Sequence, residues 1–553
     1  MGLAVRKSNV PVLGDEPIRI GSGGGFWGDR PLAPLDLLKS DDLDYLMIDY
    51  LAELTLSIMT KQKRRAPSSG WATDLELWLA AGGIHTLRKK SVKLVTNAGG
   101  ANPESCARMV LEQANKIGWH ECKVAVISGD DILPRLDYLL ENGEEFAHFE
   151  SGEKISENGA EMMSANAYLG AGPIASALEI GADIIITGRV ADASLLVGCM
   201  LHSAGWAHNA FQLGLTRESP VADWAPENVR NPLDILAQWT VAGHLIECGA
   251  QVSGGNYSNW GDVPNLATLT LPIAEIYSDG VVKITRGQGG GGMVNRGIVA
   301  EQLVYEIGDP AAYITPDVVV DMRNITLEDE SEDMVVVTGA IGKPEPESLK
   351  VSAAIEGGWF AASSLLVSGP DALGRATACD AALRGRLSAL EELEIYTEFI
   401  GGGVSLPENI RQRVSSTLNP PEVLLRWAVS STNKQDITDF SREVAPLVLT
   451  GPAGVGGYGA RPKPRRQLQF WPSLISRKSI EPFVRVELLT HLRITQESER
   501  FHFIRKRTRG ILSRLQDELD DREWTRPIVK KLGWESNDAD AEVTNLQEKE
   551  VES

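Results

Sequence analysis

Short apolar runs and longer amphipathic segments alternate along the first half of the chain. The apolar runs predict buried strands at residues 44–50, 91–96, 123–128 and 182–187. The longer segments predict helices at residues 51–61, 103–117, 171–180 and 190–200. Strands rich in Val, Ile and Leu that alternate with helices are typical of a parallel sheet. We therefore predict an α/β ligand-binding domain over residues 1–270, with a parallel sheet and helices on both of its faces.

The pattern changes from about residue 271 onwards. Shorter apolar runs predict strands at residues 317–321, 334–339, 348–355 and 422–431, and helices at 375–390 and 436–444. We interpret residues 271–488 as a smaller α+β domain. Beyond residue 489, Arg, Glu and Asp alternate with few aliphatic side chains, which predicts a helical appendage and an acidic tail over residues 489–553.

Three glycine-rich segments interrupt these elements, at residues 21–30, 287–292 and 451–459. A glycine turn after a strand or before a helix exposes backbone N–H groups, which can hold an anion. None of the three matches a dinucleotide-binding fingerprint or a P-loop. A tight turn or a hinge is the alternative interpretation of each. Three such segments in one chain favour at least one site for an anionic small molecule, and the candidate residues are Gly23, Gly24, Asp29, Arg30, Gly290 and Gly291.

The predicted parallel sheet directs attention to the loops at the carboxyl ends of its strands, because ligands bind there in open α/β sheets. These loops supply Asn97, Gly99, Gly100, Arg189 and Asp192 as candidates. Arginine suits bidentate binding of carboxylate or phosphate. The alternative is an internal Arg189–Asp192 pair that stiffens its own loop. Glu53, in the helix after the first of these strands, faces either the same site or solvent.

His244 and Glu247 form the most reactive pair in the sequence. They lie in the predicted helix 236–249, and residues three apart share a helix face. Such a pair is a candidate general acid and base, with Asp192 as a third catalytic residue, or a candidate pair of metal ligands. The alternative is a histidine stabilised near a helix C-terminus. The polar loop that follows adds Gln251 and Asn256 as candidate substrate contacts.

Charge and cysteine content exclude several classes of protein. The 553 residues carry a net charge of −21, which argues against nucleic acid and anionic membrane surfaces as partners. The five cysteines contain no CxxC pair, so no disulfide framework or zinc knuckle is predicted. No apolar run reaches the length of a membrane span, and no secretory signal is visible at the N-terminus. We expect a cytoplasmic protein, and chains of this size often form homo-oligomers.

Several segments together resemble the acyclic terpene utilisation (AtuA) family. They include IRIGSGGGFWGDR at 18–30, DLDYLMIDYLAELT at 42–55, KLVTNAGGANP at 93–103 and GHLIECGAQVSGGNY at 243–257. The set is completed by the segments at 168–195, 301–318 and 447–459, so the resemblance runs from about residue 17 to 488. The chain departs from the family pattern at Gly289–Gly292, where relatives tend to have a threonine, and at Leu54, where many have arginine.

The resemblance implies a role in the breakdown of acyclic terpenes, which proceeds through CoA thioesters of branched unsaturated acids. The departures leave another branched-chain acid open as the substrate. Our first hypothesis is an enzyme that hydrates or dehydrates an acyl-CoA or a related carboxylic substrate, without a cofactor. The second is a non-catalytic ligand-binding or assembly subunit of a pathway. The third is a metal-dependent hydrolase or lyase, which has only the His244–Glu247 spacing in its favour.

Overall fold

A large mixed sheet forms the centre of the fold. The computed structural model describes residues 13–14, 16–206, 231–414 and 419–491. Five neighbouring strands of the sheet are parallel: β1 (Ile18–Ser22), β2 (Tyr45–Ile48), β3 (Lys93–Thr96), β6 (Ile184–Thr187) and β4 (Val124–Ser128). All residues of β2, β3 and β6 are buried. Because successive side chains of a strand point to opposite faces, both faces of this part of the sheet are covered.

The sheet continues past β1 with antiparallel strands that all come from beyond residue 270, so the sheet as a whole is mixed. These strands are β7 (Pro272–Ile276), β8 (Val282–Arg286), β12 (Met334–Thr338) and β11 (Thr326–Ser331). Only five residues join β7 to β8, and so short a connection permits an antiparallel pair but not a parallel one. The sheet therefore runs across residue 270, and the domain boundary proposed there stays a prediction.

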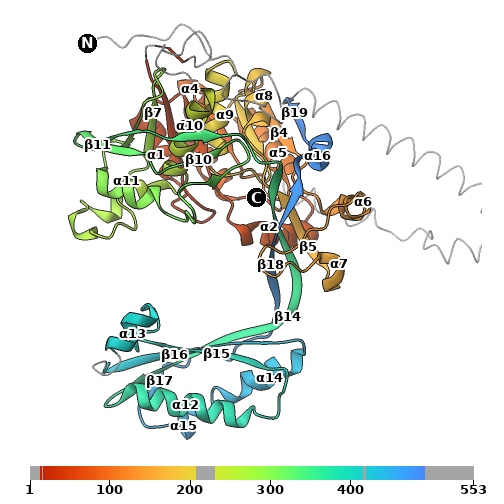
Figure 1. Ribbon diagram of the computed structural model, residues 1–553, viewed down its shortest axis with the longest axis vertical. Helices are drawn as coiled ribbons and strands as arrows, with labels where there is room; N and C mark the ends of the chain where they lie inside the picture. The colour runs from red at the N-terminus through yellow and green to blue at the C-terminus, as the bar shows by residue number, and fades with distance from the viewer. Residues whose placement is uncertain (1–12, 15, 207–230, 415–418, 492–553) are drawn as a thin grey trace, which may run out of the picture. The chain divides into compact units, whose positions relative to one another are not determined.

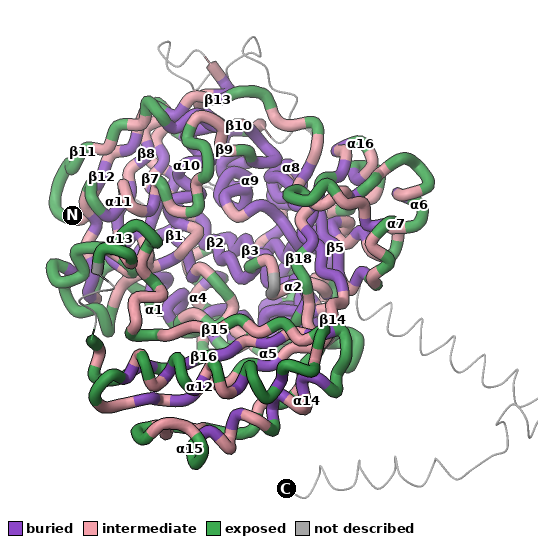
Figure 2. Tube along the Cα trace, turned by 60° about the horizontal axis from the view of Figure 1, so that its bottom comes forward, coloured by how far each residue is buried: buried purple, intermediate pink, exposed green. Residues whose placement is uncertain are grey.

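Helices pack on both faces of the parallel strands. The helices α8 (Gly172–Glu179), α9 (Ser194–Ser203) and α10 (Pro232–Glu247) share one apolar core with Tyr45, Met47 and Val95. The alternate residue Ile48 faces α1 (Ala33–Ser40), since Gly23 lies between Ile48 and Pro34. The helices α2 (Glu53–Arg65) and α4 (Ile84–Lys90) lie between β2 and β3 in the sequence, and α5 (Pro103–Lys116) follows β3. Figure 2 shows the central strands and α9 as almost entirely buried.

Helix α10 is buried on nearly all sides. Its N-terminus is fixed by Asn231, whose side chain accepts a hydrogen bond from the N–H of Leu233 at 3.1 Å, and by Pro232 in the first turn. The helix packs between the large sheet and a small sheet made of β13 (Ile341–Lys343), β10 (Val319–Asp321) and β9 (Tyr313–Ile314). A helix enclosed in this way must be apolar around its circumference, as its sequence PLDILAQWTVAGHLIE largely is.

A long strand, β14 (Ser348–Ser368), connects two apolar cores, and the predicted strand 348–355 is only its first part. This part pairs with β5 (Met162–Ala167) and with β18 (Arg465–Ser476), and its residues Val351, Ala353 and Ile355 belong to the main core. The later part pairs with β16 (Glu422–Ser431), whose other neighbour is β15 (Glu394–Ile400). Figure 1 shows β14 running from one group of elements to the other.

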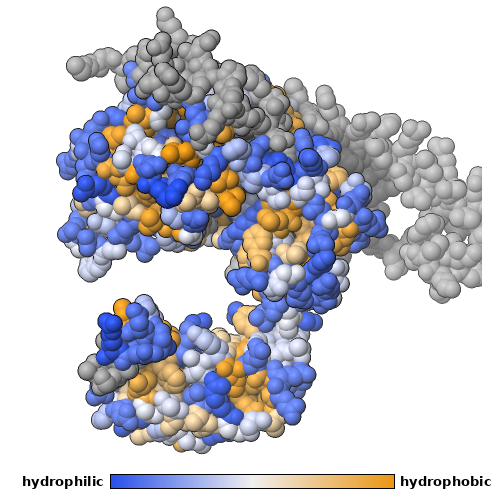
Figure 3. All heavy atoms as spheres, in the orientation of Figure 1, coloured by the Kyte–Doolittle hydropathy of each residue, from blue (hydrophilic) through white to orange (hydrophobic). Residues whose placement is uncertain are grey.

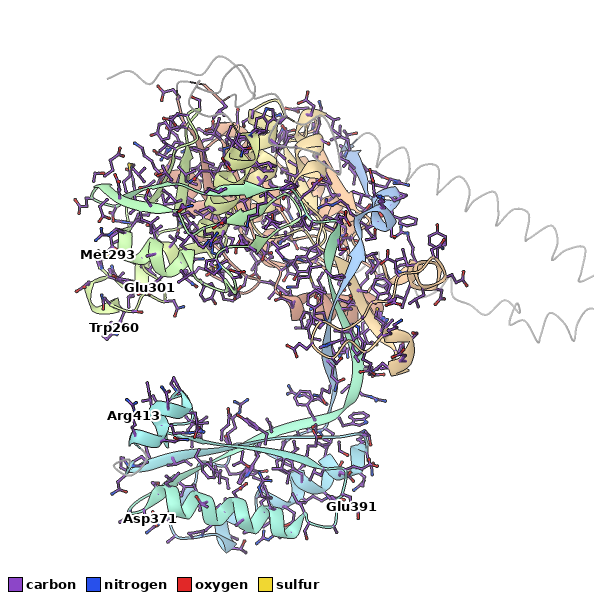
Figure 4. The ribbon with its side chains drawn as sticks, in the orientation of Figure 1. Trp260, Met293, Glu301, Asp371, Glu391 and Arg413 are labelled. Atoms are coloured by element: carbon purple, nitrogen blue, oxygen red, sulfur yellow. The ribbon has the colours of Figure 1, made fainter. Side chains whose placement is uncertain are left out.

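The second core lies between this sheet and two helices, α12 (Ala372–Arg386) and α14 (Lys434–Glu443). It contains Trp427, Phe440, Leu365 and Leu383, all fully buried. Asp371 caps α12 by accepting a hydrogen bond from the N–H of Gly374 at 3.2 Å (Figure 4). Apolar patches interrupt the charged surface of this part of the chain (Figure 3), and Leu449 on α15 (Leu447–Thr450) is exposed.

Two further observations concern the chain as a whole. It divides into two compact units, Met1–Leu488 and Leu489–Ser553. The predicted helical appendage and acidic tail lie outside the described residues from residue 492 onwards. Within the described residues, none of the helices has the length and apolar character that crossing a bilayer requires. The cytoplasmic location and the homo-oligomer remain predictions.

Candidate functional site

A cavity of about 410 Å³ lies beside the C-terminal end of α10. All three residues that the sequence suggests as catalytic, His244, Glu247 and Asp192, line it. Other polar side chains or tyrosines of its wall are Glu53, Tyr168, Tyr305, Glu306, Tyr313, Thr315, Ser348 and Lys350. The apolar side chains are Phe149, Ala191, Ile307, Ile314, Leu349 and Leu474, together with Pro316 and Pro346. The volume is within the range of about 300–1,000 Å³ that is typical of small-molecule sites.

Segments distant in sequence build this wall. Glu53 begins α2, and Asp192 follows β6, so both come from the carboxyl ends of parallel strands. His244 and Glu247 end the buried helix α10, which fixes their position. Lys350 projects from β14, about 100 residues later in the chain. The cavity therefore exists only when the large sheet, α10 and β14 are packed together.

His244 and Glu247 contact each other as their spacing predicts. His244 Nδ1 lies 3.3 Å from Glu247 Oε1, and the two side chains are 3% and 11% exposed. His244 Nε2 lies 3.1 Å from the carbonyl oxygen of Gln302 and 3.2 Å from that of Leu303, both at the end of α11 (Arg296–Leu303). Nε2 therefore carries a proton, and this N–H donates hydrogen bonds to the two carbonyl oxygens, so Nδ1 is the nitrogen that faces the carboxyl.

Burial and this contact shift both pKa values. Burial raises the pKa of Glu247 to about 7, against the opposing effect of His244. Burial acts to lower the pKa of His244, but the contact with Glu247 and the two carbonyls outweigh it and raise that pKa. Burial thus favours the neutral carboxyl of Glu247, whereas the contact between the two side chains favours the protonated form of His244. Glu247 Oε2 is buried and has no hydrogen-bond partner among the described residues. Because Glu247 lines the cavity, its carboxyl is the candidate group for proton exchange with a ligand there.

Asp192 lines the cavity, whereas Arg189 lies behind it. The guanidinium of Arg189 pairs with Asp192 Oδ1 and donates a hydrogen bond to the carbonyl of Leu51 at 2.6 Å. It also lies over the ring of Tyr168, 4.0 Å from the ring centroid. Because the Arg189 side chain is 1% exposed, it orients Asp192 and cannot itself reach a ligand in the cavity. The sequence left open whether Arg189 binds a ligand or pairs with Asp192, and the structure places it in the pair.

Lys350 and Glu53 form a second ion pair on the cavity wall. Lys350 Nζ lies 3.1 Å from Glu53 Oε1, which also accepts a hydrogen bond from the Tyr168 hydroxyl at 3.1 Å. Burial acts to raise the pKa of Glu53, but Lys350 outweighs it, and the pKa falls to about 2. Glu53 is therefore an ionised partner of Lys350. Nothing in the local sequence around Lys350 indicates this role, since its partner is 297 residues away.

Asn97 is fully buried and does not line the cavity. Its Nδ2 donates a hydrogen bond to Asp49 Oδ1 at 2.7 Å, and its Oδ1 accepts one from the N–H of Tyr50 at 2.7 Å. It thus joins the ends of β2 and β3. Gly99 and Gly100 belong to the same turn: a Cβ on Gly99 would lie 2.5 Å from the Thr187 carbonyl oxygen, and Gly100 has a positive φ of 50°. These residues shape the edge of the sheet on which the site is built.

A second cavity of about 260 Å³ contains part of the other predicted contacts. Its wall includes Arg30, Gly290, Gln288 and Thr270. The guanidinium of Arg30 donates a hydrogen bond to the Leu269 carbonyl oxygen. The carbonyls of Gly290 and Gly291 point to Arg286, whose Nη1 lies 3.2 and 3.3 Å from them.

The remaining predicted contacts lie in loops that line neither cavity. Asp29 Oδ2 accepts a hydrogen bond from the N–H of Gly25 at 3.1 Å, which closes the turn that directly follows Gly23 and Gly24. Gln251 is half-buried in a short helical turn after α10, and Asn256 is exposed with a positive φ of 57°. Glu301 holds the loop that carries Trp260 by accepting a hydrogen bond from the N–H of Ser258 at 3.0 Å (Figure 4).

Sequence reasoning did not single out Tyr168, Tyr305, Tyr313 or Lys350 as site residues. The three tyrosines lie in segments that carry the family resemblance, and this position is the one feature of the sequence that could have identified them as site residues. Among the described residues, no group of three His, Cys, Asp or Glu side chains gathers in a way that could hold a metal ion.

Comparison with known proteins gives one match. The family model described as acyclic terpene utilisation family protein AtuA matches residues 18–214 and 223–486, which is most of the chain. No curated protein and no solved structure matches the chain at a significant level. The matched residues include every residue of the cavity wall named above.

Proposed function

The chain belongs to the acyclic terpene utilisation (AtuA) family, and from that premise we propose that it is an enzyme of acyclic terpene or branched-chain acid breakdown. We propose further that it adds water to, or removes water from, an acyl-CoA or a related carboxylic substrate. The observation that carries this proposal is the buried Glu247 carboxyl at the cavity wall. One of its oxygens lies 3.3 Å from His244 Nδ1, and the other has no hydrogen-bond partner in the part of the chain that the structure describes.

Hydration of a conjugated double bond needs a base for the water and an acid for the carbon. In the proposed step, the Asp192 carboxylate accepts a proton from water while the water oxygen bonds to C3 of the substrate. The protonated Glu247 carboxyl then donates its proton to C2. Dehydration is the reverse: both protons return and water leaves. A pKa of about 7 suits Glu247 for this role, because a general acid or base works best when its pKa is near the working pH.

His244 has a positioning role in this proposal. Its Nε2–H is held by the carbonyls of Gln302 and Leu303, so its ring is fixed and only Nδ1 faces Glu247. It therefore acts on the substrate through Glu247, by orienting the carboxyl and by sharing its proton. The apolar side chains Ile307, Ile314 and Leu349 would surround the branched hydrocarbon part of the substrate.

The proposal is tested by incubating the purified full-length chain with branched enoyl-CoA and 3-hydroxyacyl-CoA thioesters and their free acids. Mass spectrometry should show gain or loss of one water on at least one compound. Glu247→Gln should lower the rate by about 10²–10⁴-fold, which is the usual contribution of a general acid or base. Glu112→Gln on α5, an exposed carboxyl remote from the cavity wall, is the matched control and should retain the rate.

Two outcomes would contradict the proposal. An unchanged rate in Glu247→Gln would remove this residue from the chemistry. Thermal stabilisation by the thioesters without conversion of any compound would favour the non-catalytic ligand-binding or assembly subunit instead.

A further inference from the structure

The cavity wall is acidic. Its carboxyl groups belong to Glu53, Asp192, Glu247 and Glu306. The two basic side chains that line it, Lys350 and His244, each contact one of these carboxyls, at 3.1 and 3.3 Å. The Lys350 ammonium has further N–H donors, but a ligand carboxylate bound there would lie beside the Glu53 carboxylate. A ligand carboxylate at His244 would likewise lie beside Glu247.

Arg189 lies behind this wall and is almost fully buried. Arg189 pairs with Asp192 and donates to the Leu51 carbonyl oxygen, and the ring of Tyr168 covers its guanidinium. Its long-range field offsets part of the negative charge of Asp192. Its Nε, which has no hydrogen-bond partner among the described residues, is buried with the rest of the side chain.

Large apolar side chains border the same cavity and are left partly in water. Phe149, Ile314 and Leu474 are 51%, 66% and 48% exposed. Each would lose apolar surface to a hydrocarbon ligand, and burial of such surface is favourable by roughly 25 cal/mol per Å². The wall thus combines apolar side chains that a ligand can cover with carboxyl groups that repel an anion.

From this distribution of charge we infer that the cavity admits its ligand in an uncharged form, as a thioester, an ester or an alcohol, and excludes the free carboxylate. The inference rests on the proposed function for the choice of a branched acyl chain. An anion would lose its hydration on entry and meet carboxylates instead of a free cation, and like-charge contacts of this kind strongly weaken binding. The sequence predicts an anionic ligand. Under this inference, the negatively charged groups of the substrate, such as the phosphates of CoA, bind outside this cavity.

The probes are two forms of one branched medium-chain 2-enoic acid, the N-acetylcysteamine thioester and the free acid. The thioester has no phosphate, so its binding reports on the acyl group alone. Isothermal titration calorimetry on the full chain at pH 8 should give a Kd for the thioester about tenfold or more below that of the acid. An acid that binds as tightly as the thioester would overturn the inference, and so would the binding of neither probe.

Two variants test the cause of this selectivity. Glu53→Gln leaves the ammonium of Lys350 without its carboxylate, and Glu306→Gln removes an exposed carboxylate from the wall. Each should lower the ratio of the two Kd values several-fold at pH 8, because the acid binds better. Glu112→Gln serves as the control and should leave the ratio unchanged. A ratio that stays constant in both cavity variants would overturn the electrostatic explanation.

Failure of this inference is distinguishable from failure of the proposed function. A preference for the thioester without any turnover would remove the proposed hydration chemistry and leave the selectivity standing. Turnover of the free acid, with no preference for the thioester, would remove the selectivity and leave the chemistry standing.

Discussion

At the scale of residues, the sequence predicted the contact between His244 and Glu247. It did not predict which of the two side chains transfers the proton and which positions its partner. Spacing by three residues on a helix was enough to predict that the side chains meet. Which nitrogen of His244 faces Glu247 depends on the carbonyls of Gln302 and Leu303, which lie 58 and 59 residues further on. Those carbonyls occupy His244 Nε2 and leave Glu247 as the group that can exchange a proton.

The pH dependence of the reaction should report the pKa of Glu247. The hydration rate requires a protonated Glu247, so it should fall as the pH rises through about 7. His244 holds this pKa down, while burial raises it. His244→Asn removes the lowering effect, and the inflection in kcat/KM should therefore move to higher pH. A thermal melt establishes that the variant is folded, and an inflection that does not move would contradict the positioning role of His244.

Buried polar residues were the least predictable members of the site. Asn97 and Arg189 have the chemistry of ligand contacts, and the loops that carry them are at the expected edge of the sheet. Both instead form hydrogen bonds inside the protein. Asn97 binds Asp49 and Tyr50, and Arg189 binds Asp192 and Leu51. Sequence reasoning about loop position cannot separate the two cases, because burial is decided by segments that lie far away in the chain.

At the scale of elements, the glycines after β1 are explained by packing. A Cβ on Gly25 would lie 2.8 to 3.0 Å from backbone atoms of Cys248, and backbone cannot move aside as the end of a side chain can. Gly249 has a positive φ of 58° and approaches Gly24 and Gly25 from the other side. The first glycine-rich segment thus lets the β1 loop contact the end of α10, directly after Glu247.

Gly25→Ala should therefore displace the end of α10, and with it Glu247, although Gly25 does not line the cavity. We expect a loss of about 1–3 kcal/mol in the free energy of unfolding, which is the usual cost of overpacking. We also expect a fall in turnover, because the end of α10 must shift. Gly261→Ala is the matched control, since no atom lies within 4 Å of its added Cβ. Chemical denaturation of both variants measures the difference, and equal stabilities would contradict the packing explanation.

Many strands and helices were predicted from local pattern, whereas others, among them β5, β7, β8, β15 and β18, were not. The strand 422–431 was predicted with the bounds of β16, and the helix 103–117 differs from α5 by one residue. The strand β5, with the sequence MMSANA, was not predicted. Its apolar content is low, and it becomes a strand by pairing with β14, nearly 190 residues later.

At the scale of the whole molecule, the α/β class was predictable and the composition of the sheet was not. Runs of Val, Ile and Leu between helices indicate parallel strands, and five such strands are present. The antiparallel strands that complete the sheet come from the part of the chain after residue 270, where the pattern resembles that of a separate unit. The cavity depends on both parts, with Glu247 from one and Lys350 from the other.

The central claim is that Glu247 transfers a proton to or from a ligand in this cavity. Its most direct test is proton exchange at C2 of a bound branched acyl thioester in D₂O, followed by NMR. The account predicts incorporation of deuterium by the wild-type chain and by Glu112→Gln, and its loss in Glu247→Gln. Incorporation that persists at the wild-type rate in Glu247→Gln would contradict the account, as would binding of the thioester by the wild-type chain with no exchange.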